Sequence, residues 1–338
     1  MDLPLAPGLS LGIQTIHRRT EPGIGAWLPE VDELVNLVQL VDRCGYDSLW
    51  VGDHVAFALP ILDPFLQLAQ AAVVSRRLTF GTGVYLLPLR HPAPVAKQVA
   101  TLDHLTEGRF IFGVGVGGEF PKEYEVCGMP IGERGARLTE SLEVLGALWS
   151  GQPATHRGRF FNFEGVTMQP PPRQPGGPPI WAGGRSDAAV KRVARMLDGW
   201  MSYVVTPDMF RQSLDKIAEA ATAIDRRFAR GFAAAHLLFT RVDKTYEDAL
   251  EAATKSLSTR YAMDFRRAAQ RYCALGRPQE VVETIRRFYD AGARHIILDF
   301  VGPYEERFDE IERFAAEAMP LLDDLRKARP ASPAGSAN

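Results

Sequence analysis

Strand-like and helix-like segments alternate along most of this 338-residue chain, and no other feature constrains its fold as strongly. Eight apolar, strand-like runs occur, each followed by a helical pattern: LSLGIQT (9–15), DSLWVG (47–52), LTFGTGVYLL (78–87), RFIFGVGV (109–116), PIWAG (179–183), GWMSYVV (199–205), GFAAAHLLFT (231–240) and RHIILDFV (294–301). This alternation favours a parallel sheet covered by helices. Eight such units predict a closed (β/α)8 barrel.

Proline, glycine and serine residues mark the expected ends of several helices. Pro92 opens one helix that ends at Gly108, and Ser186 caps another that stops before Gly199. A third helix is expected to begin at Pro29 and to end at Gly45.

One segment interrupts the alternation without dividing the chain. Residues 151–178 are rich in proline and glycine and contain alternating aromatic residues, which predicts a short hairpin and a covering loop inserted before the fifth strand. We therefore expect a single domain over residues 1–326. The small, polar, proline-rich end of the chain, residues 327–338, is expected to be a disordered tail.

Composition excludes several classes of partner. The formal net charge is −2 and the basic residues are scattered, so no nucleic-acid surface is indicated. No apolar run reaches the roughly 18 residues that a membrane helix needs. Cys44, Cys127 and Cys273 are odd in number and far apart, which indicates neither a disulfide framework nor a zinc site. We expect a small-molecule substrate, no metal ion and a cytoplasmic location.

The stretch FGVGVGGEF (112–120) fits the G-x-G-x-x-G pattern of dinucleotide-binding turns through Gly113, Gly115 and Gly118. A Rossmann turn needs the third glycine to open a helix directly, but Pro121 follows closely and the motif belongs to the fourth βα unit. We interpret Gly113 as relieving crowding inside the barrel. The later glycines would lie at the C-terminal mouth, where their missing side chains let a flat ligand touch the backbone.

A histidine at the end of the second strand is the main catalytic candidate. His54 follows Asp53, an acid that could orient it, and histidine side chains exchange protons near neutral pH. The alternative is that His54 is structural or solvated. His91 at the mouth of the third strand is a weaker candidate, and His295 begins the eighth strand, at the end of the barrel that serves stability rather than catalysis. The residues that could line the substrate pocket are His17, Trp27 and Glu119.

The stretch AGGRSDAA after the fifth strand has the features of a phosphate loop. Gly183 and Gly184 free the backbone, and the N–H groups of Gly184, Arg185 and Ser186 would open a helix whose positive end attracts a phosphate. The alternative is an ordinary Gly-Gly turn before a serine-capped helix.

Several motifs in order resemble one known family. The runs RFIFGVGVGGEFPKEYEVCGMPIGERGARLTESLEVLGALWSG, RFFNFEGV and PPIWAGGRSDAAVKRVARMLDGW are similar to the bacterial luciferase-like superfamily, and in particular to its probable coenzyme F420-dependent oxidoreductases. The resemblance covers roughly residues 9–205. The last third of the chain fits only as a generic barrel.

This resemblance implies a cofactor site at the mouth of the barrel for coenzyme F420, a deazaflavin, or for flavin mononucleotide (FMN). In the motif VGDH, Asp53 would contact the cofactor and His54 would face its reactive ring. A non-proline cis peptide would lie between Gly83 and Val84, behind the ring. The remaining cofactor-binding positions that it implies are Leu86, Val116, Gly117, Gly183, Gly184, Arg185 and Ser186.

The predicted function is hydride transfer between coenzyme F420 and a small organic substrate, with His54 handling the proton. One alternative is a monooxygenase that uses reduced FMN, and another is a non-catalytic flavin-binding protein. The resemblance bears on the choice between coenzyme F420 and FMN at one position, Val116, where FMN-dependent members can present an arginine to the phosphate. It also implies a homodimer.

Overall fold

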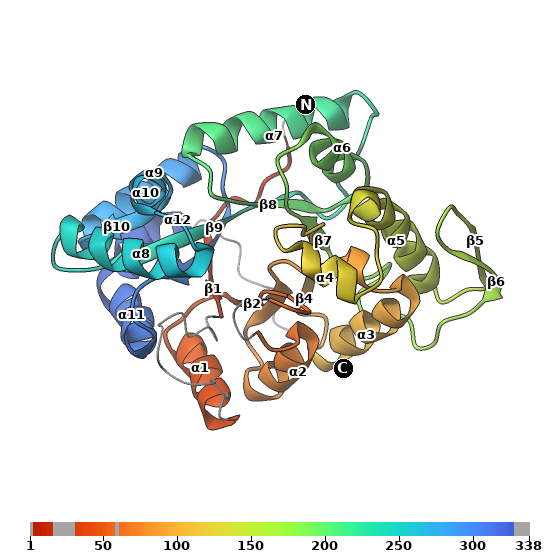
Figure 1. Ribbon diagram of the computed structural model, residues 1–338, viewed down its shortest axis with the longest axis horizontal. Coiled ribbons are helices and arrows are strands. Elements are labelled where there is room, and N and C mark those ends of the chain that lie inside the picture. Colours follow the sequence, from red (N-terminus) through yellow and green to blue (C-terminus); the bar gives the residue numbers. More distant parts are fainter. Residues whose placement is uncertain (1–2, 16–30, 58–60, 328–338) are drawn as a thin grey trace.

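Eight parallel strands close into a barrel in the computed structural model, which describes residues 3–15, 31–57 and 61–327. β1 pairs with β2 and β11, and β8 pairs with β9, so the sheet has no gap between its first and last strands. The predicted (β/α)8 barrel is thus confirmed (Figure 1). The barrel strands are β1 (Ser10–Gln14), β2 (Ser48–Val51), β3 (Thr79–Thr82), β4 (Phe110–Val114), β7 (Ile180–Ala182), β8 (Gly199–Tyr203), β9 (Ala233–Val242) and β11 (His295–Phe300).

Helices surround the strands, and Figure 1 looks down onto the strand ends inside this ring. The space between strands and helices is filled by one large apolar cluster, which is the main core of the protein. The helices are α1 (Val31–Arg43), α2 (Pro64–Val74), α3 (Pro92–Leu105), α4 (Pro121–Val126), α5 (Arg134–Trp149), α6 (Asp187–Met196), α7 (Pro207–Thr222), α8 (Tyr246–Tyr261), α9 (Arg266–Tyr272), α10 (Pro278–Asp290), α11 (Arg307–Arg313) and α12 (Asp323–Lys327).

Two of the predicted helix starts are confirmed. α3 begins at Pro92, which needs no N–H partner in the first turn. α6 follows Ser186, whose hydroxyl accepts a hydrogen bond from the backbone N–H of Ala189 and so satisfies one free donor of the first turn. The helix expected to begin at Pro29 is α1, but Pro29 lies outside the described residues.

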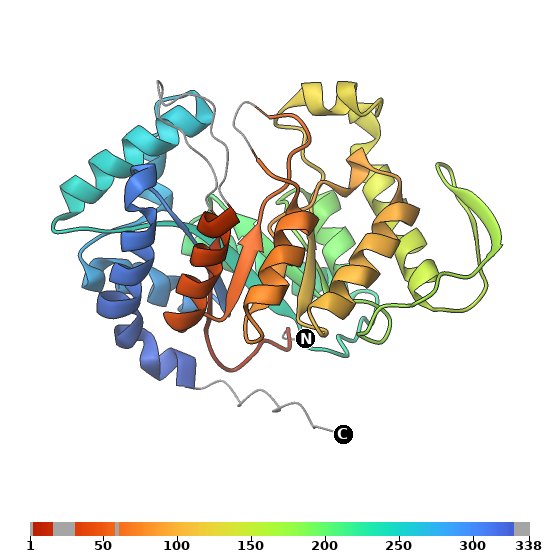
Figure 2. The ribbon, with the colours of Figure 1, turned by 90° about the horizontal axis from the view of Figure 1, so that it is seen from below.

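The insertion before the fifth barrel strand forms the predicted hairpin. β5 (Ala154–Arg157) and β6 (Asn162–Val166) pair antiparallel, and Figure 2 shows the hairpin projecting from the side of the barrel. A further strand, β10 (Ala274–Gly276), was not predicted; it pairs with the end of β9. The single domain over 1–326 stays a prediction. Within the expected tail, Lys327 ends α12 and residues 328–338 lie outside the described residues.

Aromatic side chains fill the barrel interior below the mouth. The indole rings of Trp50 and Trp181 stack with their centroids 5.1 Å apart. His295 packs edge-on against both, with its Nε2 2.9 Å from Ser48 Oγ. His295 therefore lies at the N-terminal end of β11, where it was predicted, and supports the closed floor of the barrel.

Candidate active site

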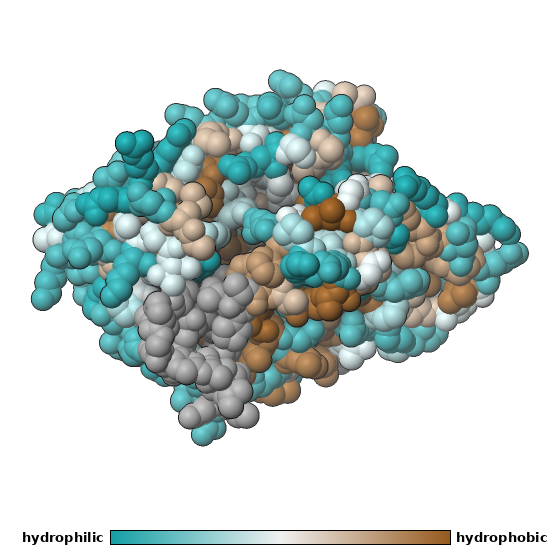
Figure 3. Space-filling view, in the orientation of Figure 1, coloured by the Kyte–Doolittle hydropathy of each residue, from teal (hydrophilic) through white to brown (hydrophobic). Residues whose placement is uncertain are grey.

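A cavity of about 1160 Å³, counting its open mouth, lies at the C-terminal ends of the barrel strands. Figure 3 shows this face of the molecule, with a hollow near its centre. The cavity brings together nine of the predicted site residues: Asp53, His54, Gly83, Val84, Leu86, Val116, Gly117, Gly183 and Gly184. Arg185 and Ser186 are not among the residues that line it.

The third strand ends in a distorted segment at the cavity. The predicted cis peptide between Gly83 and Val84 is present. The predicted strand over 78–87 was wrong in its second half, because β3 stops at Thr82 just before this peptide. Tyr85 then makes an isolated bridge to Val114, which brings Val84 and Leu86 to the cavity.

Asp53 fastens this distorted segment to the end of β2. Its carboxylate accepts hydrogen bonds from the backbone N–H of Leu86 at 2.8 Å and from Arg90 Nη2 at 2.8 Å. Burial lowers the pKa of Arg90, but the bond to Asp53 raises it, and the net direction is upward. The expectation that Asp53 orients His54 was wrong, because both of its oxygens are committed to Leu86 and Arg90.

The acid that holds His54 is Glu123 on α4. His54 Nδ1 lies 2.9 Å from Glu123 Oε2, and the Glu123 side chain is only 1% exposed. The other oxygen, Oε1, accepts the backbone N–H groups of Val55 and Ala56 at 2.7 and 3.2 Å. Glu123 therefore fixes both the imidazole and the loop that carries it. The Phe57 ring stacks on the face of the imidazole, with the ring centroids 4.0 Å apart.

Glycines after β4 form a wall of bare backbone. A Cβ on Gly115 would lie 2.4 Å from Val84 Cγ2, so any side chain there would collide with the distorted third strand. Gly117 and Gly118 have φ of +57° and +105°, which side chains rarely tolerate. The following helix, α4, is short and begins at Pro121 rather than at the third glycine, in agreement with the rejection of a Rossmann turn.

The predicted phosphate loop stands at the edge of the cavity. Gly183 and Gly184 line it, and the Gly184 carbonyl accepts a hydrogen bond from Trp200 Nε1 at 2.9 Å. Arg185 is exposed and donates to the Val204 carbonyl at 3.0 Å. On the other side of the mouth the Arg134 side chain runs along Gly118, so a second basic group lies near the glycine wall.

Gln14 and Tyr203 are among the polar side chains of the cavity that were not assigned a role from the sequence. Gln14, at the end of β1, is buried, and within the described part of the chain its Oε1 has no hydrogen-bond partner. Tyr203, at the end of β8, donates to Glu119 Oε1 at 2.5 Å. Burial, together with this neighbouring carboxylate, raises the pKa of Tyr203, so the phenol stays protonated. Glu119 therefore does line the pocket, as one of the candidates proposed above.

Of the remaining candidates that the structure describes, neither His91 nor His295 lines the cavity. His91 accepts the Ala93 N–H as the N-cap of α3, and His17 and Trp27 lie outside the described residues. Within residues 3–15, 31–57 and 61–327, no three His, Cys, Asp or Glu side chains are grouped to hold a metal ion. Over the same ranges no helix has the length and hydrophobicity to cross a membrane.

A buried histidine supports the cavity wall from behind. His236 Nδ1 lies 2.8 Å from the Oγ of Ser202, which lines the cavity, and its ring stacks on Phe288 at 4.1 Å. Burial lowers the pKa of His236 to about 3, although Ser202 opposes the shift. The imidazole is therefore neutral in the folded protein at all but acidic pH.

This burial predicts a specific acid sensitivity. The unfolded histidine binds a proton below about pH 6.5, whereas the folded one stays neutral to about pH 3, so stability falls as the pH drops. Between about pH 7 and pH 5 the wild type should lose about 2 kcal/mol of unfolding free energy relative to His236→Leu. Urea unfolding of both proteins at the two pH values measures this. Identical losses in the two proteins would contradict the prediction.

Comparisons with known proteins give the family and the fold. The family model described as luciferase-like monooxygenase matches residues 11–295. The F420-dependent glucose-6-phosphate dehydrogenase of Nakamurella multipartita is 27% identical over 331 residues, which cover 87% of this chain and 93% of that enzyme. The oxygenase component of the flavin-dependent trigonelline monooxygenase of Acinetobacter baylyi is 36% identical over 157 residues, or 46% of this chain and 43% of that protein.

Among solved structures, the monooxygenase RslO1 from Streptomyces bottropensis superimposes with a TM-score of 0.82 at 24% identity, covering 93% of this chain and 99% of that one. This similarity supports the barrel fold. The chain spans less than two thirds of the length of several curated relatives that it matches, the trigonelline monooxygenase among them.

Proposed function

The chain belongs to the luciferase-like monooxygenase family, and on this premise we propose that it transfers a hydride between coenzyme F420 and a small organic substrate. The family contains F420-dependent enzymes and flavin monooxygenases, so an oxidoreductase with a deazaflavin or a flavin is the shared activity. The observation that carries the proposal is the cavity itself, which is lined by both the glycine wall and His54, with Glu123 holding the imidazole.

The residues of the cavity fit a flat, multiply charged cofactor. Gly115 lets the backbone after β4 pack directly against Val84, because an added Cβ would lie 2.4 Å from Val84 Cγ2, and Gly117 and Gly118 continue this bare backbone along the cavity. The Gln14 Oε1 atom is buried, has no partner among the described residues, and offers an acceptor to a ring N–H. The backbone N–H groups at the start of α6 and the guanidinium groups of Arg185 and Arg134 would hold the phosphate and the charged tail.

Coenzyme F420, when bound, supplies a carbon that accepts or donates a hydride. His54 would supply or remove the proton that must accompany the hydride on the substrate. Because Glu123 holds Nδ1, the Nε2 atom is the one left to face the reacting groups. Asp53 would act indirectly, by holding Leu86 and hence the distorted third strand on which the ring rests.

A monooxygenase that uses reduced FMN is the second candidate, because one relative is named as the oxygenase component of a flavin-dependent trigonelline monooxygenase. Two observations favour coenzyme F420. The F420-dependent relative matches over most of both chains, whereas the flavin-dependent one matches over less than half of each. Val116, which lines the cavity, is uncharged at the position where FMN-dependent members can present an arginine.

The two candidates differ in whether they consume oxygen. The purified chain is incubated with reduced F420 under anaerobic conditions together with a panel of small carbonyl compounds, and oxidation of the coenzyme is followed by absorbance. Substrate-dependent oxidation of F420 without oxygen is the expected result. Oxygen consumption with reduced FMN would favour the monooxygenase, and binding of either cofactor without any turnover would favour a non-catalytic protein.

A homodimer and a cytoplasmic location complete the proposal. Leu66 and Val73 on α2 are 74% and 67% exposed, and Figure 3 shows hydrophobic side chains gathered over this part of the surface. An exposed apolar face of this kind is typical of an interface between copies. Light scattering of the purified chain measures whether one copy or two are present, and cell fractionation tests the location.

A further inference from the structure

The last third of the chain builds the side of the cavity that faces the glycine wall. In the barrel order, β9 and β11 lie across from β3 and β4. Five cavity residues come from this side, and we call them the β9–β11 wall: Leu237 and Phe239 from β9, Arg260 and Tyr261 from α8, and Asp299 from β11. If the cofactor rests on the glycine side, as proposed above, this wall is left for the substrate.

A buried ion pair is the central feature of the β9–β11 wall. Arg260 Nη1 and Nη2 lie 2.8 and 3.3 Å from the two carboxylate oxygens of Asp299, and the residues are only 8% and 3% exposed. The guanidinium carbon is 5.5 Å from the centroid of the Phe239 ring, and the Tyr261 ring packs edge-on against Phe239. The wall thus combines flat aromatic surface with the Arg260 guanidinium, whose charge Asp299 already balances.

One donor of this ion pair is unused. Arg260 Nε is buried and has no hydrogen-bond partner among the residues that the structure describes. A buried N–H without an acceptor destabilises the protein, and an oxygen atom of a bound molecule would satisfy it. Because Asp299 already balances the charge of Arg260, a second carboxylate would add uncompensated negative charge to a cavity that also contains Glu119.

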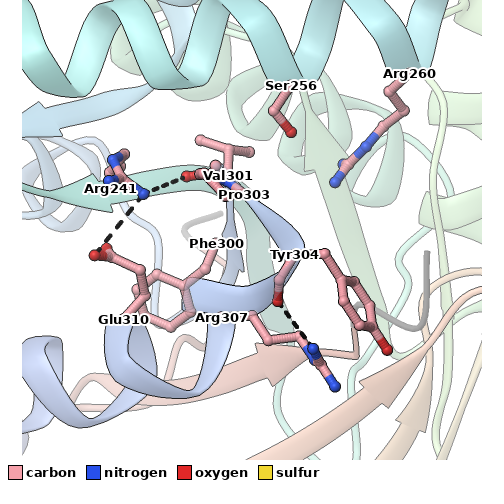
Figure 4. Close-up of a pocket in the computed structure, with 10 residues that line it drawn as sticks. Arg241, Ser256, Arg260, Phe300, Val301, Pro303, Tyr304, Arg307 and Glu310 are labelled. Carbon is pink, nitrogen blue, oxygen red and sulfur yellow. Dashed lines mark hydrogen bonds and ion pairs between the residues drawn. The ribbon is translucent and has the colours of Figure 1, made fainter. Parts of the chain in front are cut away.

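Arg260 also borders a smaller pocket, shown in Figure 4, in which Arg260 and Ser256 project from α8. The two other arginines of that pocket are engaged by carboxylates. Arg241 lies 2.7 Å from Glu306, and Arg307 pairs with Glu33. Ser256 lines only the smaller pocket, so it provides a control on the opposite side of Arg260.

We propose that the β9–β11 wall is the substrate subsite and selects an uncharged, flat molecule with a carbonyl oxygen that accepts a hydrogen bond from Arg260 Nε. The proposal rests on the F420-dependent function for the placement of the cofactor on the opposite side. In this proposal Arg260 determines which substrate binds, because it contacts a part of the substrate that need not react.

Three probes with the same ring test this subsite: acetophenone offers a neutral carbonyl, benzoate a carboxylate, and ethylbenzene no acceptor. Their affinities are measured by ligand-detected NMR titration of the full chain, with and without oxidised F420. We expect acetophenone to bind about tenfold more tightly than either of the others, as one hydrogen bond to a charged donor implies. Arg260→Lys keeps a charge beside Asp299 but removes the Nε donor, and should abolish this preference.

Two further variants keep the test decisive. Arg260→Met combined with Asp299→Asn removes both charges together, avoids an unpaired buried carboxylate, and should also abolish the preference for acetophenone. Ser256→Ala should leave it unchanged. Coenzyme affinity should stay within threefold of wild type in all variants.

Benzoate binding as tightly as acetophenone, or an unchanged preference in Arg260→Lys, would overturn the subsite. Failure of the wild type to bind F420 would instead refute the proposed function. In that case the preference for acetophenone, measured on the coenzyme-free chain, would still decide whether the β9–β11 wall binds the substrate.

Discussion

Replacing His54 with alanine is expected to lower turnover by about 10²–10⁴-fold, the usual contribution of a positioned proton donor or acceptor. The side chain lies at the cavity with its Nδ1 held by Glu123, so its loss removes the proton transfer without touching the glycine wall. Coenzyme affinity should therefore stay within a few-fold of wild type. Steady-state oxidation of reduced F420, with a substrate found in the carbonyl panel, measures the effect.

Two matched variants sharpen this test. Glu123→Gln keeps the shape of the side chain but removes the negative charge beside Nδ1, so it should lower turnover and shift its pH profile. His104→Ala removes an exposed histidine whose Nε2 lies 2.9 Å from the Pro171 carbonyl oxygen and which does not line the cavity, and should leave turnover unchanged. Wild-type turnover in His54→Ala would exclude His54 from the mechanism.

Gly113→Ala is expected to lower the free energy of unfolding by about 1–3 kcal/mol, the usual cost of overpacking. A Cβ at this position would lie 1.9 Å from the Thr82 carbonyl oxygen, and backbone cannot rotate away as a side chain can. Since Thr82 leads directly into the Gly83–Val84 peptide, its displacement should also weaken coenzyme binding. Urea unfolding and coenzyme titration measure the two effects.

The control for this substitution should change stability in the opposite direction. Gly146 lies on the exposed face of α5, where nothing stands within 4 Å of an added Cβ. Gly146→Ala should therefore raise stability by about 0.5–1 kcal/mol, because alanine favours a helix more than glycine does. Equal stabilities of Gly113→Ala and wild type would show that the barrel accommodates the methyl group and that Gly113 is not required there.

Features that depend on neighbouring residues were predictable from the sequence. The strand-helix alternation, the Ser186 cap and the 151–178 hairpin are all local patterns, and each is present. Strand three was overestimated because LTFGTGVYLL remains apolar beyond Thr82, so its composition does not show where regular pairing ends. β10 is only three residues long, which is too short for a hydrophobic period to identify.

The site was predicted less completely because its partners are distant along the chain. Asp53 is adjacent to His54 in sequence, but neighbours on an extended chain point to opposite faces. Glu123, 69 positions later, is the residue that reaches the imidazole. Glu123 lies in a short helix after the glycine wall. The only signal in the sequence was an acidic residue that closely follows a loop at the mouth of the barrel. The pairing of Arg260 with Asp299 spans 39 positions and left no local signal.

Calorimetric titration of the purified chain with oxidised F420 and with FMN tests the central claim most directly. Without an arginine at Val116, FMN loses a charge-assisted bond of about 1.5–3 kcal/mol, a factor of roughly 10–150 in affinity. F420 has a longer charged tail that can use Arg134 and Arg185 as well. Tighter binding of F420 is the predicted result. Tighter binding of FMN, together with oxygen consumption by its reduced form, would contradict the account and identify a monooxygenase.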